Sequence, residues 1–182
     1  IAKYPTVLKD YWLEKDAVNP YCFMQRLSEH LSENQIIVTG DGTACVVSFQ
    51  AMQLKPGQRL YTNSGCASMG YDLPAAIGAC FANNRKPVIL ITGEGSLMFN
   101  LQELQTISYY KLPIKIFLLN NNGYLAIKNS QNSYFLGEFA AVDNKTGLNF
   151  PDFKKKLGDN GKKKIRLDFN IIKNSNKIIN IY

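Results

Sequence analysis

Two short polar segments near the middle of the chain have the composition of a metal and phosphate site. Gly93-Glu94-Gly95-Ser96 offers one carboxylate and backbone N–H groups, and Asn120-Asn121-Asn122-Gly123 offers amide and backbone oxygens. Oxygen ligands of this kind, few in number, suit Mg²⁺, which completes its octahedron with phosphate oxygens and water. The N–H groups of Gly95 and Ser96, near a helix start, could bind a phosphate. The predicted chemistry is that of a metal-bridged diphosphate.

The residues between these two segments predict the elements that position them. Residues 87–92 (PVILIT) and 114–119 (IKIFLL) are apolar runs typical of strands. Leucines at helical spacing lie between them: Leu97, Leu101 and Leu104. Asn100 with Glu103 matches a cap followed by a glutamate, and Leu112-Pro113 ends the helix. Because such a strand–helix–strand unit is right-handed with parallel strands, both polar segments should lie at one sheet edge.

The rest of the chain continues this alternation. Asn19-Pro20 predicts the start of a helix that runs to about Ser32. Further elements are expected as strands at 36–39 and 59–62 and helices at 44–53 and 69–82. The predicted fold class is α/β, with an open, mostly parallel sheet and helices on both faces. Ligands of such sheets bind beyond the carboxyl ends of the strands.

Three ordered blocks resemble those of a known enzyme family. The polar segments resemble the thiamine diphosphate signature, G-D-G and then a pair of asparagines, with Glu94 and Asn121 27 positions apart. Residues 63–79, NSGCASMGYDLPAAIGA, resemble the pyrimidine-ring segment of acetolactate synthase-like enzymes, SG…MGYGLPAAIGA. Residues 150–153, FPDF, resemble the segment that comes after the cofactor loop in those enzymes. The resemblance covers residues 19–157 and implies the C-terminal thiamine diphosphate-binding domain and fold of such an enzyme.

The resemblance implies a site residue by residue. The Mg²⁺ ligands would be Glu94, the side-chain oxygen of Asn121 and the backbone carbonyl of Gly123. The cofactor-binding positions would be Gly42, Thr43, Ala44, Ala67, Ser68, Met69, Gly93, Gly95, Ser96, Asn121, Gly123, Tyr124 and Leu125. Met69 would hold thiamine diphosphate in the bent shape in which its 4′-amino group deprotonates its own thiazolium C2. The implied reaction decarboxylates a 2-keto acid and transfers the acyl unit.

The sequence departs from the family pattern in three respects. Glu94 replaces the usual aspartate, which adds one methylene to a ligand of a metal that tolerates little geometric error. Thr43-Ala44 replace the glutamine–histidine pair common in acetolactate synthases. The activating glutamate belongs to a pyrimidine-binding domain with no counterpart here, so no catalytic residue is expected in this chain. The implied partners are that domain, usually from a second subunit of a homo-oligomer, and a 2-keto acid.

Other interpretations of the same residues remain open. The chain could be the cofactor subunit of a split 2-keto acid decarboxylase, or a non-catalytic relative that keeps the fold. Asn120, Asn121 and Asn122 could form only a polar turn, and Met69 could be a core residue. Binding of thiamine diphosphate and Mg²⁺ would separate these interpretations.

The charge is concentrated in the C-terminal tail. The net charge of the 182 residues is +7, and residues 154–182 alone carry +7, while residues 1–153 are neutral. This distribution argues against a nucleic-acid surface on the folded domain. Lys, Asn and Ile make up 19 of the 29 residues in 154–182. We consider a frameshift near Lys154–Lys156, because A/T-only codons encode these three amino acids, or a solvated basic extension with a strand at 164–169.

The remaining features predict domain boundaries and compartment. Residues 1–18 are predicted as a linker from a missing upstream domain, residues 19–157 as the cofactor-binding domain, and 158–182 as a basic tail. The spacing of Cys22, Cys45, Cys66 and Cys80 fits no zinc site, and a reducing cytoplasm is expected. No apolar run is long enough for a membrane span.

Overall fold

The computed structural model describes residues 4–14, 17–121, 123–143 and 145. Within these ranges the strands are β1 (Ile36–Thr39), β2 (Arg59–Tyr61), β3 (Val88–Gly93) and β4 (Ile114–Leu119). The helices are η1 (Lys9–Leu13), α1 (Pro20–His30), α2 (Thr43–Ala51), α3 (Asp72–Ala82), α4 (Glu94–Met98), η2 (Leu101–Glu103), α5 (Leu104–Tyr110) and α6 (Leu125–Tyr134). The strands predicted at 36–39, 59–62, 87–92 and 114–119 are confirmed to within one residue at each end.

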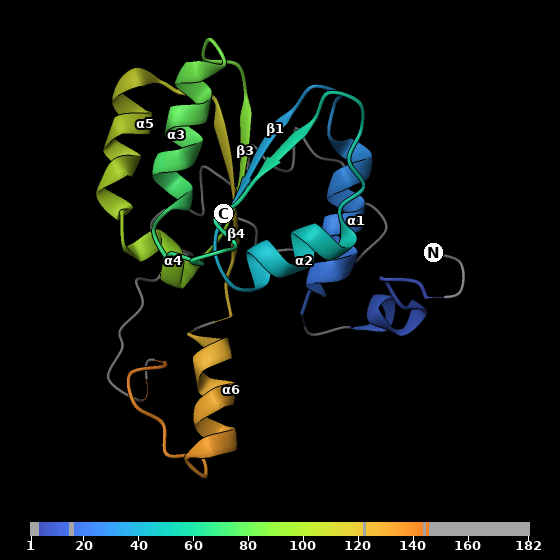
Figure 1. Ribbon diagram of the computed structural model, residues 1–182, viewed down its shortest axis with the longest axis vertical. Helices are drawn as coiled ribbons and strands as arrows, with labels where there is room; N and C mark the ends of the chain where they lie inside the picture. The colour runs from blue at the N-terminus through green and yellow to red at the C-terminus, as the bar shows by residue number, and fades with distance from the viewer. Residues whose placement is uncertain (1–3, 15–16, 122, 144, 146–182) are drawn as a thin grey trace.

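The strands form one parallel sheet in the order β2-β1-β3-β4 (Figure 1). Thr39 of β1 lies opposite Ile91 of β3, and Gly93 of β3 lies opposite Leu119 of β4, so these strands end close to one edge. From β1 the chain moves outward to β2 and then returns to β3 on the other side of β1. This reversal makes the carboxyl edge between β1 and β3 a topological switch point, where open α/β sheets bind ligands.

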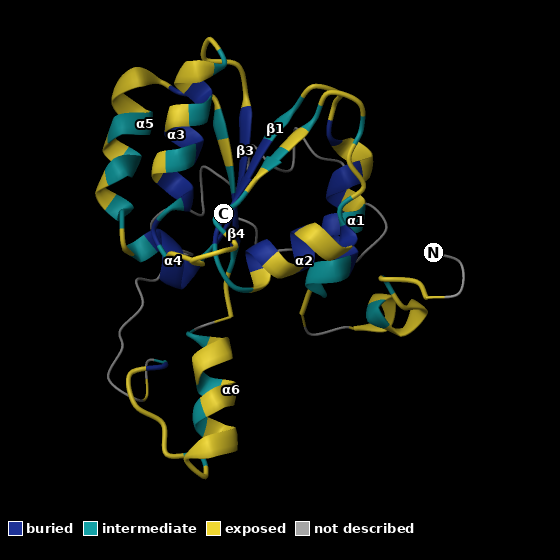
Figure 2. Cartoon of the chain, viewed as in Figure 1, coloured by how far each residue is buried: buried dark blue, intermediate teal, exposed yellow. Residues whose placement is uncertain are grey.

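Helices cover both faces of the sheet, as predicted (Figure 1). On one face, α1 and α2 enclose a core of buried residues: Phe23, Met24, Leu27, Leu31, Ile37, Ala44, Val47, Ala51, Ile89, Ile91 and Phe117. On the other, α3, α4 and α5 enclose Val38, Leu73, Ala76, Ile77, Cys80, Val88, Leu90, Leu97, Leu112 and Leu118. Strands β1 and β3 are covered on both faces (Figure 2). Double coverage explains why they are continuous apolar runs.

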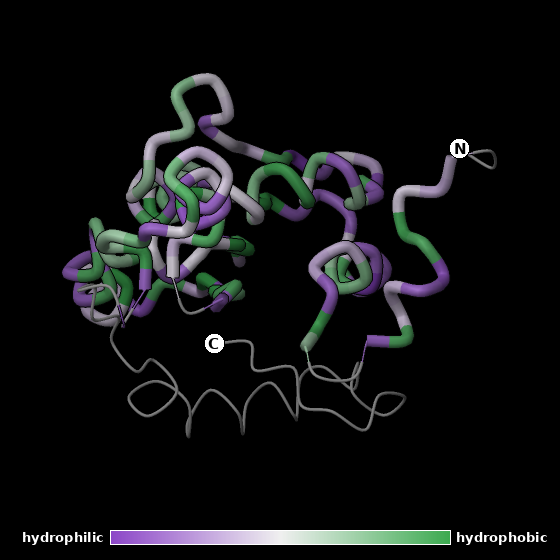
Figure 3. The backbone as a smooth tube through the Cα atoms, turned by 90° about the horizontal axis from the view of Figure 1, so that it is seen from below, coloured by the Kyte–Doolittle hydropathy of each residue, from purple (hydrophilic) through white to green (hydrophobic). Residues whose placement is uncertain are grey.

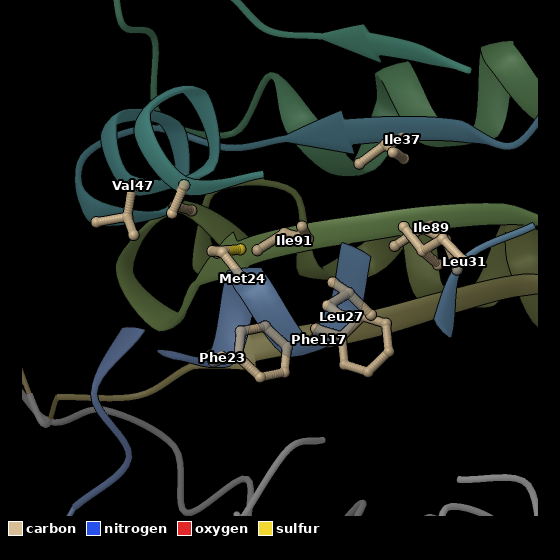
Figure 4. Packing of buried hydrophobic residues seen from close by; sticks show 11 residues of the cluster. Phe23, Met24, Leu27, Leu31, Ile37, Val47, Ile89, Ile91 and Phe117 are labelled. Carbon is tan, nitrogen blue, oxygen red and sulfur yellow. The ribbon is translucent and has the colours of Figure 1, made fainter. Parts of the chain in front are cut away.

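The face under α1 shows how the helix is held. Figure 4 shows Phe23, Met24 and Leu27 of α1 directed toward the sheet, where the rings of Phe23 and Phe117 lie 5.6 Å apart at 58°. Leu27 is fully buried, and burial of a leucine contributes about 1.5–3 kcal/mol. Hydrophobic and hydrophilic stretches alternate along the helices in the perpendicular view (Figure 3). Packing of one apolar face therefore holds α1 on the sheet.

The predicted start of α1 is confirmed. The side chain of Asn19 accepts a hydrogen bond from the backbone N–H of Tyr21 at 3.0 Å, and Pro20 is the first helical residue. Such a cap contributes about 1 kcal/mol. The helix ends at His30, two residues before the predicted end at Ser32.

The predicted helix between β3 and β4 is wrong in detail. The chain becomes helical at Glu94, directly after β3, and then breaks into α4, η2 and α5. Asn100 and Glu103 form no capping box, because the side chain of Asn100 makes no capping bond and donates instead to the carbonyl of Gly70. The apolar face itself is confirmed, since its leucines pack into the second core: Leu97, Leu101 and Leu104.

Two parts of the chain lie outside the layers around the sheet. The predicted linker contains η1, whose Trp12 ring lies 5.1 Å from the guanidinium of Arg26 in α1. Helix α6, which the sequence analysis did not predict, extends away from the sheet and has no buried residue (Figure 1). In the part of the chain that the structure describes, no helix is long and apolar enough to span a membrane. The FPDF segment, the strand expected at 164–169 and the basic tail lie outside the described residues.

Candidate functional site

Three loops meet at the carboxyl edge of the sheet. The loop after β1 carries Gly40–Gly42, β3 runs directly into Glu94, and the loop after β4 carries Asn120 and Asn121. Because β1, β3 and β4 are adjacent and parallel, the sheet itself brings these loops together. The two polar segments that the sequence separates by 27 positions are therefore neighbours in the fold, as predicted.

The carboxylate of Glu94 is buried and joins two of these loops. Its side chain is only 2% exposed. Its Oε1 accepts hydrogen bonds from the backbone N–H groups of Asn121, at 3.1 Å, and Gly123, at 2.9 Å. The sequence analysis expected oxygens of Asn121 and Gly123 beside Glu94, whereas the structure turns their N–H groups toward it. The glutamate side chain, one methylene longer than the aspartate of the family, reaches the backbone of the asparagine loop with its carboxylate.

A segment far along the chain closes over Gly123. The N–H of Tyr124 donates to the carbonyl of Val142 at 2.8 Å, beside an antiparallel bridge between Gly123 and Asp143. A Cβ on Gly123 would overlap that same carbonyl, and φ is +156°. Lys128 of α6 forms an ion pair with Asp143 at 2.7 Å. The sequence analysis missed Val142 and Asp143, because no local pattern marks a pairing of single residues.

Tyr124 lies against the turn that carries Glu94. A Cβ on Gly95 would overlap the Tyr124 ring, so only glycine fits beneath it. Burial, and secondarily the negative charge of Glu94, raise the pKa of the Tyr124 phenol above its ordinary value. Tyr124 therefore stays protonated at neutral pH. Leu125, the next residue predicted for the reacting end, begins α6 and is exposed.

The loop after β1 has the geometry of an anion-binding helix start. Gly42 has φ +61° and ψ −133°, which favours glycine, and α2 begins at the next residue. Thr43 is exposed, whereas the side chain of Ala44 is buried. The N-terminus of α2 thus points its backbone N–H groups out at the sheet edge, where a phosphate could accept them. The diphosphate-binding roles of Gly42 and Thr43 stay predictions, in which their backbone N–H groups rather than their side chains would bind the phosphate.

The segment expected at the pyrimidine ring, residues 67–70, is hydrogen-bonded to α4. Ala67 and Ser68 are exposed, Ala67 has φ +50°, and Met69 is half-buried. Ser96, predicted as a diphosphate donor, accepts a hydrogen bond through its Oγ from the N–H of Gly70 at 2.9 Å. The hydroxyl proton of Ser96 is not used by that bond, because oxygen is the acceptor. The structure therefore connects two predicted parts of the site through one serine.

Asp72 is a buried carboxylate that the sequence analysis missed. It is fully buried at the start of α3, where it accepts hydrogen bonds from the Thr92 hydroxyl and from the N–H of Leu73. A Cβ on Gly40 would overlap its Oδ2. Asp72 thus links the ends of β1 and β3 beneath both loops. The sequence contained one indication of its role: the family block SG…MGYGLPAAIGA has glycine at the position that Asp72 occupies in this chain.

The donor types at this edge fit a hard divalent cation. Among the described residues, no three His, Cys, Asp or Glu side chains gather as metal ligands. A cation between the loops would therefore rely on Glu94 with amide and backbone oxygens, a set that suits Mg²⁺. Gly123 gives its N–H to Glu94, and its neighbour Tyr124 makes the bond to Val142, so neither of these two bonds involves the carbonyl of Gly123.

Comparison with known proteins agrees with this architecture. Residues 32–170 match the family model described as "Thiamine pyrophosphate enzyme, C-terminal TPP binding domain", a range that extends past the boundary expected at residue 157. The chain is 38% identical over 129 residues to acetolactate synthase isozyme 1 large subunit of Escherichia coli, covering 70% of this chain and 23% of that protein. It is 35% identical over 137 residues to the acetolactate synthase large subunit of Cyanidium caldarium, covering 75% and 23%.

A plant relative gives the same result. The chain is 39% identical over 119 residues to acetolactate synthase 2, chloroplastic, of Nicotiana tabacum, covering 65% of this chain and 18% of that protein. The chain thus spans about a fifth of the length of the curated relatives it matches. The predicted fold and family are confirmed: the chain belongs to the thiamine pyrophosphate enzymes and carries their C-terminal, cofactor-binding domain.

Proposed function

We propose that this chain forms the thiamine diphosphate- and Mg²⁺-binding part of an acetolactate synthase-like enzyme. The enzyme decarboxylates a 2-keto acid and transfers the acyl unit. The observation that supports this proposal is the position of Glu94, whose buried carboxylate contacts the loop of Asn121 and Gly123 at the switch point of the sheet. A carboxylate with amide and backbone oxygens at such an edge supplies the ligand types that suit Mg²⁺.

Each loop has a separate task in this proposal. Glu94, the Asn121 side chain and the Gly123 carbonyl hold Mg²⁺. Backbone N–H groups bind the diphosphate at two loops: Gly42, Thr43 and Ala44 after β1, and Gly93, Gly95 and Ser96 after β3. Residues of the segment between β2 and α3, Ala67, Ser68 and Met69, contact the pyrimidine ring. When bound, thiamine diphosphate would supply the nucleophilic carbon and hold the electron pair that departing CO₂ leaves behind.

The protein contributes orientation and exclusion of water near the reacting end. Tyr124 covers Gly95 and borders that end together with Leu125. With its pKa raised by burial and by Glu94, its phenol remains a neutral hydrogen-bond donor at neutral pH. A neutral donor can orient a 2-keto acid carbonyl without adding negative charge beside the diphosphate.

The site is completed by a second domain. In this proposal the glutamate that activates the aminopyrimidine ring comes from a pyrimidine-binding domain. That domain belongs to a second subunit of a homo-oligomer. The exposed face of α6 beside the site, with Leu125 and Ile127, is available for such a contact. The four free cysteines accord with a reducing compartment such as the cytoplasm.

Two alternatives make different predictions. In a split 2-keto acid decarboxylase this chain would bind the cofactor and gain activity when a separate pyrimidine-domain chain is added. In a non-catalytic relative, motivated by the glutamate at position 94 where the family has aspartate, the loops would hold neither metal nor cofactor.

Calorimetric titration separates these functions. The full chain is titrated with thiamine diphosphate at saturating Mg²⁺ and again with EDTA. We expect saturable, Mg²⁺-dependent binding that Asn121→Ala weakens at least tenfold, which is about 1.4 kcal/mol. Asn129→Ala, on the exposed surface of α6, is the matched control and should bind like the wild type. Absence of binding with and without a supplied pyrimidine domain would favour the non-catalytic relative.

A second arm of this experiment changes the length of the side chain at position 94. Glu94→Asp withdraws the carboxylate from the N–H groups of Asn121 and Gly123 by one methylene. We expect weaker stability without metal and tighter Mg²⁺ binding, since the carboxylate is then released for the cation. Unchanged Mg²⁺ binding by the variant would show that the carboxylate does not serve the metal, and weaker binding would show that it serves the metal only at the length of glutamate.

A further inference from the structure

The backbone of Gly70 is held at both of its polar groups by residues that follow β3. Its N–H donates to Oγ of Ser96 at 2.9 Å, and its carbonyl accepts from Nδ2 of Asn100 at 2.5 Å. Gly70 is buried, so these bonds replace those that water would make. Gly70 and Asn100 are 30 positions apart in sequence, and no local pattern connects them.

We propose that Asn100 is a positioning residue that fixes the ring-binding turn, Ala67–Gly70, relative to the turn that carries Glu94 and Ser96. This role rests on the proposed function, because it requires that thiamine diphosphate contact both turns. Asn100 does not touch the cofactor in this proposal. It acts through the carbonyl of Gly70.

Packing around Gly70 leaves no room for a side chain at this position. Gly70 has φ +84°, and a Cβ there would lie 2.7 Å from Cβ of Phe99 and 2.9 Å from Nδ2 of Asn100. A side chain would therefore displace the side chains of Phe99 and Asn100. The half-buried Met69, the predicted support for the bent cofactor, is directly attached to this fixed point. The position of Met69 thus depends on the bonds to Gly70.

The break between α4 and η2 has a reason in the same contact. Asn100 has φ −136° and lies outside both helices, although leucines on either side keep the helical spacing. This backbone directs its side chain back toward Gly70. Nε2 of Gln102 donates to Oδ1 of Asn100 at 3.2 Å, which leaves Nδ2 as the group that faces the carbonyl. A continuous helix with the predicted capping box would have used the side chain locally.

Coupling two turns in this way matters only for a ligand that spans them. Thiamine diphosphate has a diphosphate for one turn and a pyrimidine ring for the other, and a preorganised pair of turns binds it without a further loss of conformational freedom. Pyrophosphate engages the diphosphate turn alone. Loss of the Asn100 bond should therefore weaken thiamine diphosphate and leave pyrophosphate unaffected.

The test compares these two ligands on the full chain in saturating Mg²⁺. Affinities are measured by calorimetry for the wild type, Asn100→Ala and Asn100→Asp, which keeps the shape of the side chain but lacks the N–H donor. Gln102→Ala is the control, because it removes only the contact to Oδ1. We expect both Asn100 variants to bind thiamine diphosphate about tenfold more weakly, with pyrophosphate affinity within about twofold of the wild type. Equal losses for both ligands, or no loss for either, would overturn the proposal.

A second readout needs no ligand. Cys66 is exposed and lies four residues before Gly70, so the rate at which a small thiol reagent modifies it reports the mobility of this turn. We expect faster modification in Asn100→Ala and Asn100→Asp than in the wild type or Gln102→Ala. Unchanged rates would refute the coupling even if the wild type bound thiamine diphosphate. Conversely, faster modification without any cofactor binding would refute the proposed function and confine Asn100 to a role in folding.

Discussion

Replacement of Glu94 by alanine tests the contact on which the site depends. The wild-type carboxylate is buried, and its Oε1 accepts hydrogen bonds from the backbone N–H groups of Asn121, at 3.1 Å, and Gly123, at 2.9 Å. In Glu94→Ala both N–H groups lose their partner. A glutamine at the same position keeps the shape and one acceptor oxygen, but it loses the charge and carries an NH₂ donor in place of the second oxygen. The pair of variants therefore separates the loss of bonds from the loss of charge.

The magnitude follows from the two bonds. An unsatisfied buried N–H costs about 1–3 kcal/mol. Asn121 lies in an exposed loop that water can reach, so the lower half of that range applies, and Glu94→Ala should lose about 3 kcal/mol in total. Glu94→Gln should lose about 1 kcal/mol, since weaker neutral bonds are offset in part by no longer burying a charge.

The assay is urea unfolding followed by circular dichroism, in EDTA and without thiamine diphosphate. With a slope of about 2 kcal/mol per molar urea, a loss of about 3 kcal/mol lowers the midpoint by about 1.5 M. Glu33→Ala, an exposed glutamate, is the control and should stay within about 0.5 kcal/mol of the wild type. A loss below about 1 kcal/mol for Glu94→Ala, or equal losses for both variants, would refute the argument.

Three further outcomes follow from single contacts. Because folding raises the pKa of Tyr124, its phenol ionises at lower pH in the unfolded chain than in the folded one. The contribution of this phenol to the free energy of unfolding is therefore constant below about pH 10 and falls as the pH rises through the folded pKa. Unfolding free energies between pH 9 and 11 should show this fall in the wild type and less of it in Tyr124→Phe. Gly40→Ala should cost about 1–3 kcal/mol because its Cβ meets the Asp72 carboxylate, and less when Asp72 is also alanine. Titration with Ellman's reagent should find one fast thiol, Cys66, because the other three cysteines are buried.

Each of these outcomes has a result that would contradict it. An identical pH dependence in wild type and Tyr124→Phe would mean that the phenol does not contribute. Strict additivity of Gly40→Ala and Asp72→Ala would show that the two positions do not compete for space. A fast thiol that survives in Cys66→Ser would place another cysteine at the surface.

Local sequence patterns predict much of this fold because they act over short distances. The runs at 87–92 and 114–119 form β3 and β4, since strands buried on both faces must be continuously apolar. Asn19-Pro20 begins α1 because a cap and a fixed proline φ are properties of two adjacent residues. Because the strands of a strand–helix–strand unit are parallel, the same patterns predicted that the two polar segments lie at one edge of the sheet.

Contacts between distant residues could not be predicted in this way. Asn100 has the local signature of a capping box, yet its side chain bonds Gly70, because the folded chain offers a buried carbonyl there that needs a donor. Asp72 resembles an ordinary polar helix residue, yet it is fully buried between Gly40 and Thr92. Neither partner is near in sequence.

The sequence by itself determined which residues this chain would bring to the carboxyl edge of its sheet, since the strand–helix–strand pattern and the family blocks are both written locally. Only the tertiary structure decided what Glu94 touches there. Its carboxylate reaches the N–H groups of Asn121 and Gly123, because the bridge to residues 142–143 orients that loop and the burial of Glu94 demands partners for its oxygens. Hydrogen bonds of this kind depend on distance and direction in space, which the order of residues does not specify.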